Sequence, residues 1–382
     1  MKWNIPLADI DFGPEESAAV AEVIHSKWLT MGAVTQEFER GFADYVGVKY
    51  AIAVANGTAA LHLACLAMDI SPGDEVIVPS LTFVATANAI RYAGATPIFA
   101  DIVGENDLNI SYQSIKKLIT KRTRAIIVVH YGGYACDMSD IMALAREYNL
   151  GVIEDTAHAV GSELEGRKLG TWSTLGCFSF FSNKNMTTGE GGMIVTNEEA
   201  ISQKLHLLRS HGMTTMTWDR HKGHAWSYDV VDLGYNYRID EIRAALGVVQ
   251  LRKVEKNNAR RRHLTQLYHE TLQEMAPQIT LPFGKHAGIS AAHLMPVLLP
   301  HSTNRVDFME QLKAHGIQTS IHYPPIHLFS AYRDFQKSDG SLSMTEDVAA
   351  REVTLPLYPT MSNDDVTTIA HAIRESLQRS IY

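Results

Sequence analysis

The sequence has little cysteine and no long uninterrupted apolar run. Cys65, Cys136 and Cys177 are widely spaced in 382 residues and form no CxxC or Cys/His pattern, so we expect buried thiols rather than disulfides or a metal site. No stretch approaches the roughly 18 consecutive apolar residues of a membrane helix. The start, MKWNIPLADIDFGPEE, lacks the regions of a signal peptide, so we expect a cytoplasmic protein without membrane contact.

An excess of positive charge is also lacking. The formal net charge of -8 argues against nucleic acid as the main partner. The basic run RKVEKNNARRR is more typical of a solvated helix face than of a nucleic-acid site. There is no internal repeat or low-complexity segment. With 46% hydrophobic residues, a chain of this length can bury the core of one large and one smaller domain.

Short apolar runs alternate with amphipathic helical patterns through the first half of the chain. This order predicts an α/β fold, a parallel sheet covered by helices on both faces. In such sheets ligands bind beyond the carboxyl ends of the strands. The expected strands are residues 50–55, 74–79, 96–102, 124–130 and 150–155, and the expected helices include 57–68, 83–94 and 138–149.

The second half of the chain predicts a change of domain. Residues 176–181 and 191–197 resemble further strands, and a long helical pattern runs from about Ile239 to Met275. Such a helix can join two domains. We therefore predict a large domain, 1–250, which includes the N-terminal segment, and a smaller C-terminal α/β domain, 251–382.

The segment VANGTAALHLA places Asn56, Gly57 and Thr58 between an expected strand and an expected helix. The free backbone N–H groups and positive dipole end of such a helix can hold a phosphate, and Gly57 allows close approach. A purely structural alternative remains, in which Asn56-Gly57 forms a turn and Thr58 caps the helix.

The segment VIEDTAHAVG ends an almost entirely apolar strand with Glu154 and Asp155. A carboxylate that emerges from a buried strand needs a cation or hydrogen-bond donors, because an isolated buried charge is very costly. Asp155 could cap the following turn or hold a ring nitrogen in its protonated form. His158 could be a core histidine with its bonds satisfied, or could contact a ligand oxygen.

Lys184 lies in SFFSNKNMTTGEGG, after an apolar and aromatic run and before several glycines. A nucleophilic lysine needs surroundings that lower the pKa of its amine, and the glycines leave room for a flat ligand. The alternative is a surface lysine beside a glycine-rich turn. Phosphate seat, strand-end aspartate and lysine, taken together, describe a site for pyridoxal 5'-phosphate (PLP).

Longer blocks in the same order carry a specific resemblance. The chain resembles the DegT/DnrJ/EryC1/StrS family of sugar aminotransferases over almost its whole length. The resemblance implies fold type I, with PLP (and its amine form, PMP) as cofactor. The matching blocks are SKWLTMGAVTQEFE, ANGTAALHLA, GDEVIVPSLTFVATANAI, IEDTAHAVG, SFFSNKNMTTGEGG, DLGYNYRIDEIRAALG and IHYPPIHL.

This resemblance implies the catalytic roles of two residues. Lys184 would hold the cofactor covalently and later move the proton between cofactor and substrate. Asp155 would pair with the pyridine nitrogen and keep it protonated, so that the ring draws electrons from the carbanion. Family members that dehydrate keto-sugars carry His at the lysine position, so Lys184 favours transamination.

The resemblance also implies how the cofactor is held. His158 stands where the family has Gln or His, near the phenolic oxygen of the ring. Phe83 would stack against the ring face. Gly57, Thr58 and Ser179 would bind the phosphate. Asn236 would reach that phosphate from the neighbouring subunit of a homodimer with shared active sites.

The expected substrate residues follow from the same resemblance. Thr30, Gly32, His322 and Tyr323 would border the pocket for a keto-sugar. Arg238 could meet the carboxylate of the amino donor or belong to a structural ion pair.

The segment 213–228 would lie beside the partner's site. Its aromatic and histidine side chains could contact the nucleotide or pack the dimer. They are Trp218, His221, His224 and Trp226.

The implied function is transfer of an amino group from L-glutamate, or glutamine, to the keto carbon of a nucleotide-linked deoxysugar. Such a reaction serves surface polysaccharide, lipopolysaccharide or natural-product synthesis. A carbocyclic ketone of the inosose or aminoshikimate type is the alternative substrate. A PLP-binding regulator without turnover is a further alternative, which the intact lysine and aspartate disfavour.

Overall fold

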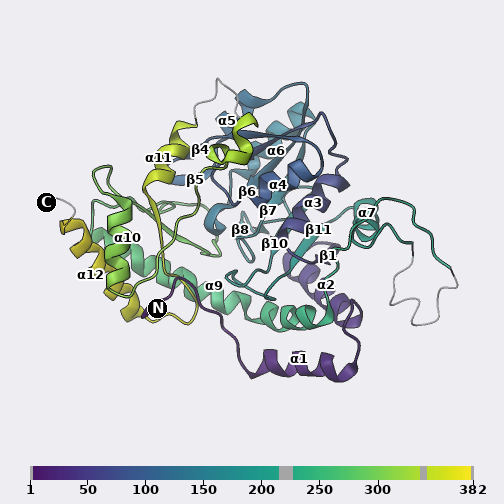
Figure 1. The fold of residues 1–382 in the computed structure, drawn as a ribbon, viewed down its shortest axis with the longest axis horizontal. Helices are drawn as coiled ribbons and strands as arrows, with labels where there is room; N and C mark the ends of the chain where they lie inside the picture. Colours follow the sequence, from purple (N-terminus) through teal and green to yellow (C-terminus); the bar gives the residue numbers. More distant parts are fainter. Residues whose placement is uncertain (1–2, 215–226, 336–341, 380–382) are drawn as a thin grey trace.

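The described part of the chain, residues 3–214, 227–335 and 342–379, forms an α/β structure in this computed structural model (Figure 1). A seven-stranded sheet lies at its centre, in the order β1-β11-β10-β7-β6-β2-β3. Strand β11 runs antiparallel to β1 and β10, and the other neighbouring pairs are parallel. The expected fold is therefore confirmed, with β11 as the exception to its parallel sheet. The strands are β1 (Tyr50–Val54), β2 (Glu75–Pro79), β3 (Thr96–Ala100), β6 (Thr123–Val129), β7 (Gly151–Asp155), β10 (Leu175–Ser179) and β11 (Gly192–Thr196).

Helices cover both faces of this sheet, which explains why its strands are apolar on both sides. Side chains alternate along β7, so Ile153 and Asp155 face one layer while Val152 and Glu154 face the other. The first layer is α3 (Gly57–Ala67), α4 (Ala85–Tyr92) and α7 (Glu199–Arg209); the second is α2 (Ala33–Val46), α5 (Tyr112–Leu118), α6 (Met138–Tyr148) and the first half of α9 (Glu241–Met275).

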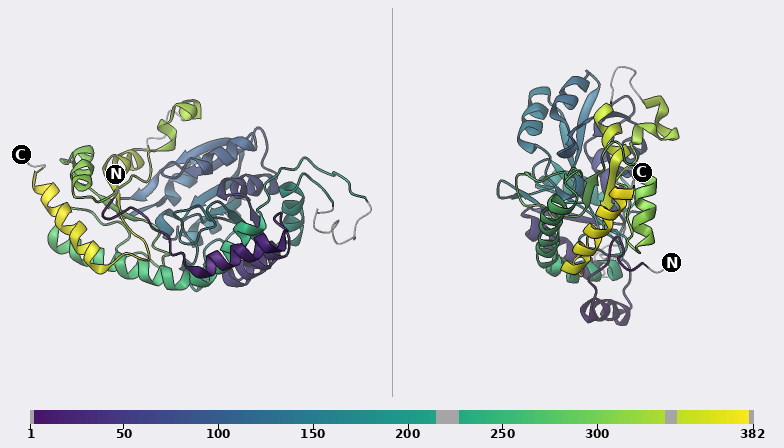
Figure 2. Two further views of the ribbon diagram at one scale, coloured as in Figure 1. Left: turned by 60° about the horizontal axis from the view of Figure 1, so that its bottom comes forward. Right: turned by 90° about the vertical axis from the view of Figure 1, so that its left-hand side faces the viewer.

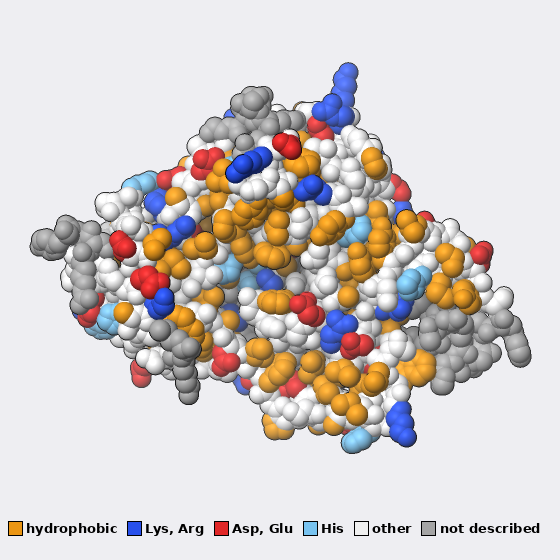
Figure 3. All heavy atoms as spheres, in the orientation of Figure 1, with side chains coloured by type: hydrophobic (Ala, Val, Ile, Leu, Met, Phe, Trp, Pro, Cys, Tyr) orange, Lys and Arg blue, Asp and Glu red, His pale blue; other side chains and the backbone are white. Residues whose placement is uncertain are grey.

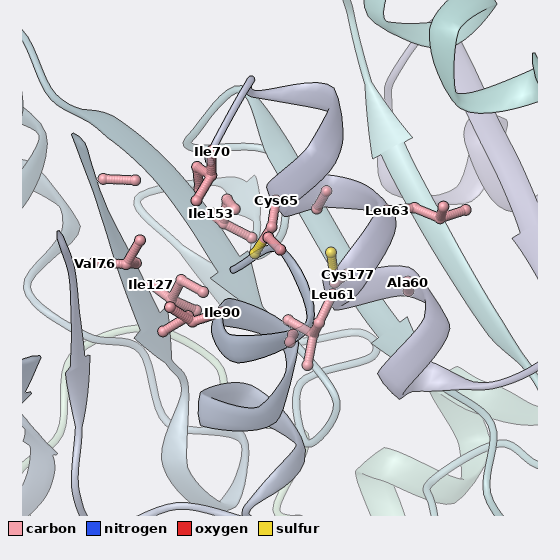
Figure 4. Packing of buried hydrophobic residues seen from close by; sticks show 14 of the residues in the cluster. Ala60, Leu61, Leu63, Cys65, Ile70, Val76, Ile90, Ile127, Ile153 and Cys177 are labelled. Atoms are coloured by element: carbon pink, nitrogen blue, oxygen red, sulfur yellow. The ribbon is translucent and has the colours of Figure 1, made fainter. Parts of the chain in front are cut away.

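The three cysteines are buried and unpaired, as expected. Cys65 of α3 and Cys177 of β10 lie in the apolar layer between helix and sheet, beside Leu61 and Ile153 (Figure 4). Burial raises the pKa of the Cys65 thiol to about 12. These thiols therefore act as small apolar groups in the core.

The long helix α9 takes part in two separate cores. Its first half packs against α1 (Pro14–Ser26) and α2, and its second half packs against α12 (Asn363–Arg379), which lies beside it in Figure 2. The second core also includes Ile5, which bridges to Ile317. The division into domains 1–250 and 251–382 stays a prediction.

The remaining elements are short. None of the helices in the described residues is long and apolar enough to cross a membrane. The remaining elements are α10 (Arg305–Ala314), α11 (Ser343–Arg351), the two-stranded sheets β4 (Ile102–Gly104) with β5 (Asp107–Ile110), β8 (Glu163–Leu164) with β9 (Arg167–Lys168) and β12 (Met295–Leu298) with β13 (Glu352–Leu355), and the 3-10 turns Tyr131–Gly133, Ile326–Leu328 and Ser330–Phe335.

Candidate active site

A cavity of about 410 Å³ lies where several strands of the central sheet end. This volume suits a small cofactor or ligand. The starts of α3 and α4, the loop after β10 and a segment of the C-terminal part of the chain enclose it. The sequence-predicted residues that line it are Gly57, Thr58, Phe83, Asp155, His158, Ser179, Lys184, His322 and Tyr323.

The N-terminus of α3 forms one wall. Asn56 is the N-cap, because its side chain accepts from the backbone N–H of Ala59 at 2.8 Å. The alternative that Thr58 caps the helix is therefore wrong. A Cβ on Gly57 would lie 2.8 Å from the Cβ of Ser179, so a larger residue would collide with the end of β10. Gly57 thus lets the N-terminus of α3 and Ser179, both candidates for phosphate binding, approach each other.

Asp155 sits at the end of β7 with its carboxylate on the α4 side of the sheet. It is 4% exposed, and accepts from Thr86 Oγ1 at 2.8 Å and from Ala157 N at 3.1 Å. Burial raises the pKa of Asp155, against the opposing effect of these hydrogen bonds. A cation in the cavity would offset that cost, which suits a protonated ring nitrogen.

Lys184 follows β10 on a loop that returns into β11. The loop is closed by the hydrogen bonds Thr188 N to Phe180 O and Phe180 N to Gly191 O, both 2.9 Å. Cavity walls surround the lysine side chain although part of its surface stays accessible. This burial lowers the pKa of Lys184 to about 8, with Asp155 acting in the opposite direction. The amine therefore loses its proton and becomes a nucleophile at a lower pH than an ordinary lysine does.

The orientation of His158 follows from its two hydrogen bonds. Its Nδ1 accepts from the backbone N–H of Gly132 at 3.3 Å, so its proton lies on Nε2, which donates to Tyr323 Oη at 3.0 Å. Burial lowers the pKa of His158 well below its usual range. The neutral ring therefore leaves the Tyr323 hydroxyl proton free to donate into the cavity.

His322 is supported from behind by the start of β13. Its Nδ1 lies 2.8 Å from Thr354 Oγ1, and its backbone N–H donates to Glu352 Oε2 at 2.7 Å. Burial and the charge of Lys184 lower the pKa of His322 to about 4. Burial raises the pKa of Glu352 to about 8. Both effects keep this wall uncharged over much of the physiological range.

Phe83 lies at the mouth of the cavity. Its side chain is 57% exposed, and its ring centroid is 6.0 Å from that of Tyr323. A flat ligand entering the cavity would cover an apolar surface that is otherwise in water.

Four predicted residues are not among the described residues that line this cavity. Thr30 is exposed, and the backbone N–H of Gly32 donates to Glu241 Oε1 at 2.8 Å. Asn236 is exposed and forms an isolated β-bridge with Ser210 through its backbone. The backbone of Arg238 forms another with Val54. Their ligand roles stay predictions. The candidates Trp218, His221, His224 and Trp226 lie outside the described residues.

Several polar residues at the site, among them Thr86 and His293, were not predicted from the sequence. Thr86 stands one helical turn after Phe83, a spacing that could have suggested a shared face. His293, whose Nε2 lies 3.5 Å from Lys184 Nζ, follows the lysine by 109 positions and carries no sequence signal of this pairing.

A second cluster of polar groups lies elsewhere on the molecule. The ligand atoms of Glu105, His301 and Asp347 lie within 4.8 Å of one another, a spacing that can hold a metal ion. Arg351 pairs with both carboxylates, however. The cluster is therefore better described as an ion-pair group.

The donor set of the cavity fits PLP. It combines an amine of lowered pKa, a buried carboxylate and a helix N-terminus beside a serine hydroxyl. These groups match the carbonyl, the ring nitrogen and the phosphate of that molecule.

Comparisons with known proteins point in the same direction. The family model described as the DegT/DnrJ/EryC1/StrS aminotransferase family matches residues 11–374. The spore coat polysaccharide biosynthesis protein SpsC of Bacillus subtilis is 38% identical, over 98% of this chain and 96% of its own. Helicobacter pylori PseC, an aminotransferase involved in the biosynthesis of pseudoaminic acid, is 31% identical, with a TM-score of 0.90 over 99% of this chain and 100% of its own.

A third similar protein is known with its cofactor. The PLP form of the putative sugar aminotransferase Spr1654 from Streptococcus pneumoniae is 26% identical, with a TM-score of 0.91 over the whole of both chains. The same protein is also known in a PMP form.

Proposed function

The chain belongs to the DegT/DnrJ/EryC1/StrS aminotransferase family, whose members use PLP, and from this premise we propose a nucleotide-sugar aminotransferase. It would move an amino group from L-glutamate, or glutamine, to the keto carbon of a nucleotide-linked deoxysugar. The observation that carries the proposal is one cavity with a lysine amine of lowered pKa, a buried aspartate and a helix N-terminus.

Each residue can be given a task in that reaction. Bound PLP supplies an electron sink for the carbanion formed when a proton leaves the carbon next to nitrogen. Lys184 would hold the cofactor covalently and, once its amine is free, would carry that proton. Asp155 holds the ring nitrogen in its charged form. Ser179 and the start of α3 bind the phosphate, which fixes the cofactor while the lysine moves.

The pKa of Lys184 leads to a pH prediction. Below pH 8 the amine is mostly charged and cannot attack, whereas above pH 8 it is mostly neutral. The rate at which cofactor-free protein captures PLP should therefore rise about tenfold from pH 7 to pH 9 and then level off. Stopped-flow absorbance measures this rate. A continued rise through pH 10 would indicate an ordinary lysine instead.

Two relatives support a sugar substrate. SpsC is named for polysaccharide biosynthesis, and Spr1654 is described as a putative sugar aminotransferase. A nucleotide-linked sugar adds a diphosphate and a base for binding. That remote binding can orient the keto carbon over the cofactor and accelerate the reaction.

The substrate class can be tested with the amine form of the enzyme. The protein is first converted to this form with L-glutamate, and a panel of nucleotide keto-sugars, free keto-sugars and an inosose is then added. Return of the visible absorbance of lysine-bound cofactor reports amino transfer. We expect rates with a nucleotide-linked ketone at least about 100-fold above those with unlinked ketones. Equal rates with inosose would favour the carbocyclic alternative.

We further propose a homodimer in which each active site uses both chains. Large apolar side chains are exposed in the described part of the chain, among them Phe83 and Phe181 at the cavity, and Figure 3 shows hydrophobic side chains gathered across the centre of the face it presents. Asn236 is also exposed, so it can reach a neighbouring subunit. The exposed apolar residues include Leu29, Phe83, Phe181, Val231 and Leu233.

Mixed dimers test the shared site. Asn236→Glu would place a carboxylate against the partner's phosphate, and Lys184→Ala would remove the amine, so each homodimer should be nearly inactive. Refolding equal amounts together should restore up to about one quarter of wild-type activity, because half of the dimers are mixed and each has one intact site. If Asn236 serves its own chain, confirmed mixed dimers stay inactive.

A further inference from the structure

His293 lies next to Lys184 in space, at the start of the segment that leads into β12. Its side chain is 5% exposed, and its Nε2 lies 3.5 Å from Lys184 Nζ. This distance is at the outer limit of a hydrogen bond. The lysine side chain is a flexible four-carbon chain, and catalytic hydrogen bonds are often long when no ligand is bound. A small rotation of this side chain is therefore enough to bring Nζ to hydrogen-bond distance from Nε2.

A chain of hydrogen bonds fixes which ring nitrogen of His293 carries the proton. The carbonyl of Val160 can only accept, so Asn258 donates to it through Nδ2 at 2.8 Å. Asn258 Oδ1 then accepts from Asn185 Nδ2, which also donates to the carbonyl of Ala291, each at 2.7 Å. Asn185 Oδ1 is left as an acceptor, so His293 Nδ1, 2.8 Å away, must be protonated.

The lone pair of His293 Nε2 therefore faces Lys184. Burial, and after it the charge of Lys184, lower the pKa of His293 well below its usual range. The ring thus stays neutral at physiological pH, and its lone pair is available as an acceptor.

We propose that His293 is a positioning residue that receives Lys184, through a hydrogen bond from Nζ to Nε2, whenever the lysine is not attached to the cofactor. A released lysine with free rotation would lose its alignment with the substrate carbon. The acceptor keeps Nζ within reach and stabilises the charged amine after it takes up a proton. The titratable groups around Lys184 include Asp155, His158, His293 and His322, and Glu190 and Tyr323 line the same cavity.

Two substitutions separate this role from a structural one. In His293→Asn the amide nitrogen can occupy the place of Nδ1 and keep the bond to Asn185, while nothing reaches Lys184. In His293→Gln the longer side chain can place its carbonyl oxygen where Nε2 was, at the cost of the bond to Asn185. His293→Asn should keep the stability of the protein and lose the contact with Lys184. His293→Gln should keep the contact with Lys184 and lose stability.

The protonation of Lys184 can be measured in cofactor-free protein. Acetic anhydride labels neutral amines, so mass spectrometry over a pH series gives the titration midpoint of Lys184, with exposed Lys116 as internal standard. The inference rests on the proposed role of Lys184, but the labelling needs neither substrate nor turnover. Its failure is therefore distinguishable from failure of the proposed function.

An acceptor that bonds to the charged amine raises its pKa, so removal of the acceptor should lower it. We expect the midpoint of Lys184 to fall by about one unit in His293→Asn and to stay near the wild-type value in His293→Gln. With PLP and both substrates, kcat should fall about tenfold in the Asn variant with KM unchanged. Equal midpoints in wild type and His293→Asn would overturn the proposal.

Wild-type protein provides a measurement that does not depend on a variant keeping its fold. Nitrogen NMR of labelled histidines should show His293 protonated at Nδ1 and unprotonated at Nε2, the resonances being assigned by their loss in His293→Gln. A proton on Nε2 would overturn the proposal, because that nitrogen could not then accept from Lys184.

Discussion

Replacing Lys184 with alanine should abolish covalent binding of PLP and lower turnover by about 10⁴-fold. The same amine would hold the cofactor and carry the proton, so one substitution removes both functions. Borohydride reduction followed by mass spectrometry should place the cofactor on the Lys184 peptide of wild type and on no peptide of the variant. Stability should not fall, because the substitution removes a buried amine that loses hydration in the folded protein.

Lys204→Ala is the matched control. This lysine lies on α7 and pairs with Asp69 at the surface, at 2.5 Å. Exposed ion pairs contribute little, so its loss should leave cofactor attachment and turnover unchanged. Turnover by Lys184→Ala within tenfold of wild type would contradict the mechanism.

Replacing Asp155 with asparagine should lower kcat by about 10³-fold while PLP remains bound. The amide cannot supply the negative charge that, in the proposed mechanism, would keep the ring nitrogen of bound PLP protonated. Excess PLP should not restore activity, since the defect lies in the chemistry rather than in binding. Steady-state kinetics at several PLP concentrations, with absorbance to measure cofactor occupancy, distinguish these two effects.

Glu154→Gln is the control on the same strand. Glu154 faces the opposite layer, where it accepts from Gly170 N at 2.7 Å and Ser173 N at 2.8 Å and pairs with His130. Its substitution should cost about 1–3 kcal/mol of unfolding free energy and leave kcat nearly unchanged. If both variants lose stability and activity to the same extent, the assignment of a catalytic role to Asp155 and a structural role to Glu154 is wrong.

The sequence was informative about Asp155 and Lys184 for a physical reason. Asp155 ends a buried apolar strand and Lys184 follows another, and parallel strands that end at one edge of a sheet bring such residues together. The antiparallel direction of β11 was not predictable in this way, because a buried strand has the same apolar pattern in either direction.

Contacts between distant segments were not predictable. Thr86 meets Asp155 across 69 positions, and His293 meets Lys184 across 109. Gly32 shows the same limit, because its backbone contact with Glu241 spans 209 positions. Nothing in the local pattern around any of these residues identifies its partner.

The sequence by itself determined the strands of the central sheet, several of its helices, the burial of the sheet on both faces and the strand-end residues of the candidate site. These depend on hydrophobic periodicity and backbone preference, which are local properties of the chain. The tertiary structure decided which polar groups meet, such as Thr86 with Asp155, and therefore the pKa values and proton positions. Those depend on burial and on hydrogen bonds between segments that packing alone brings together.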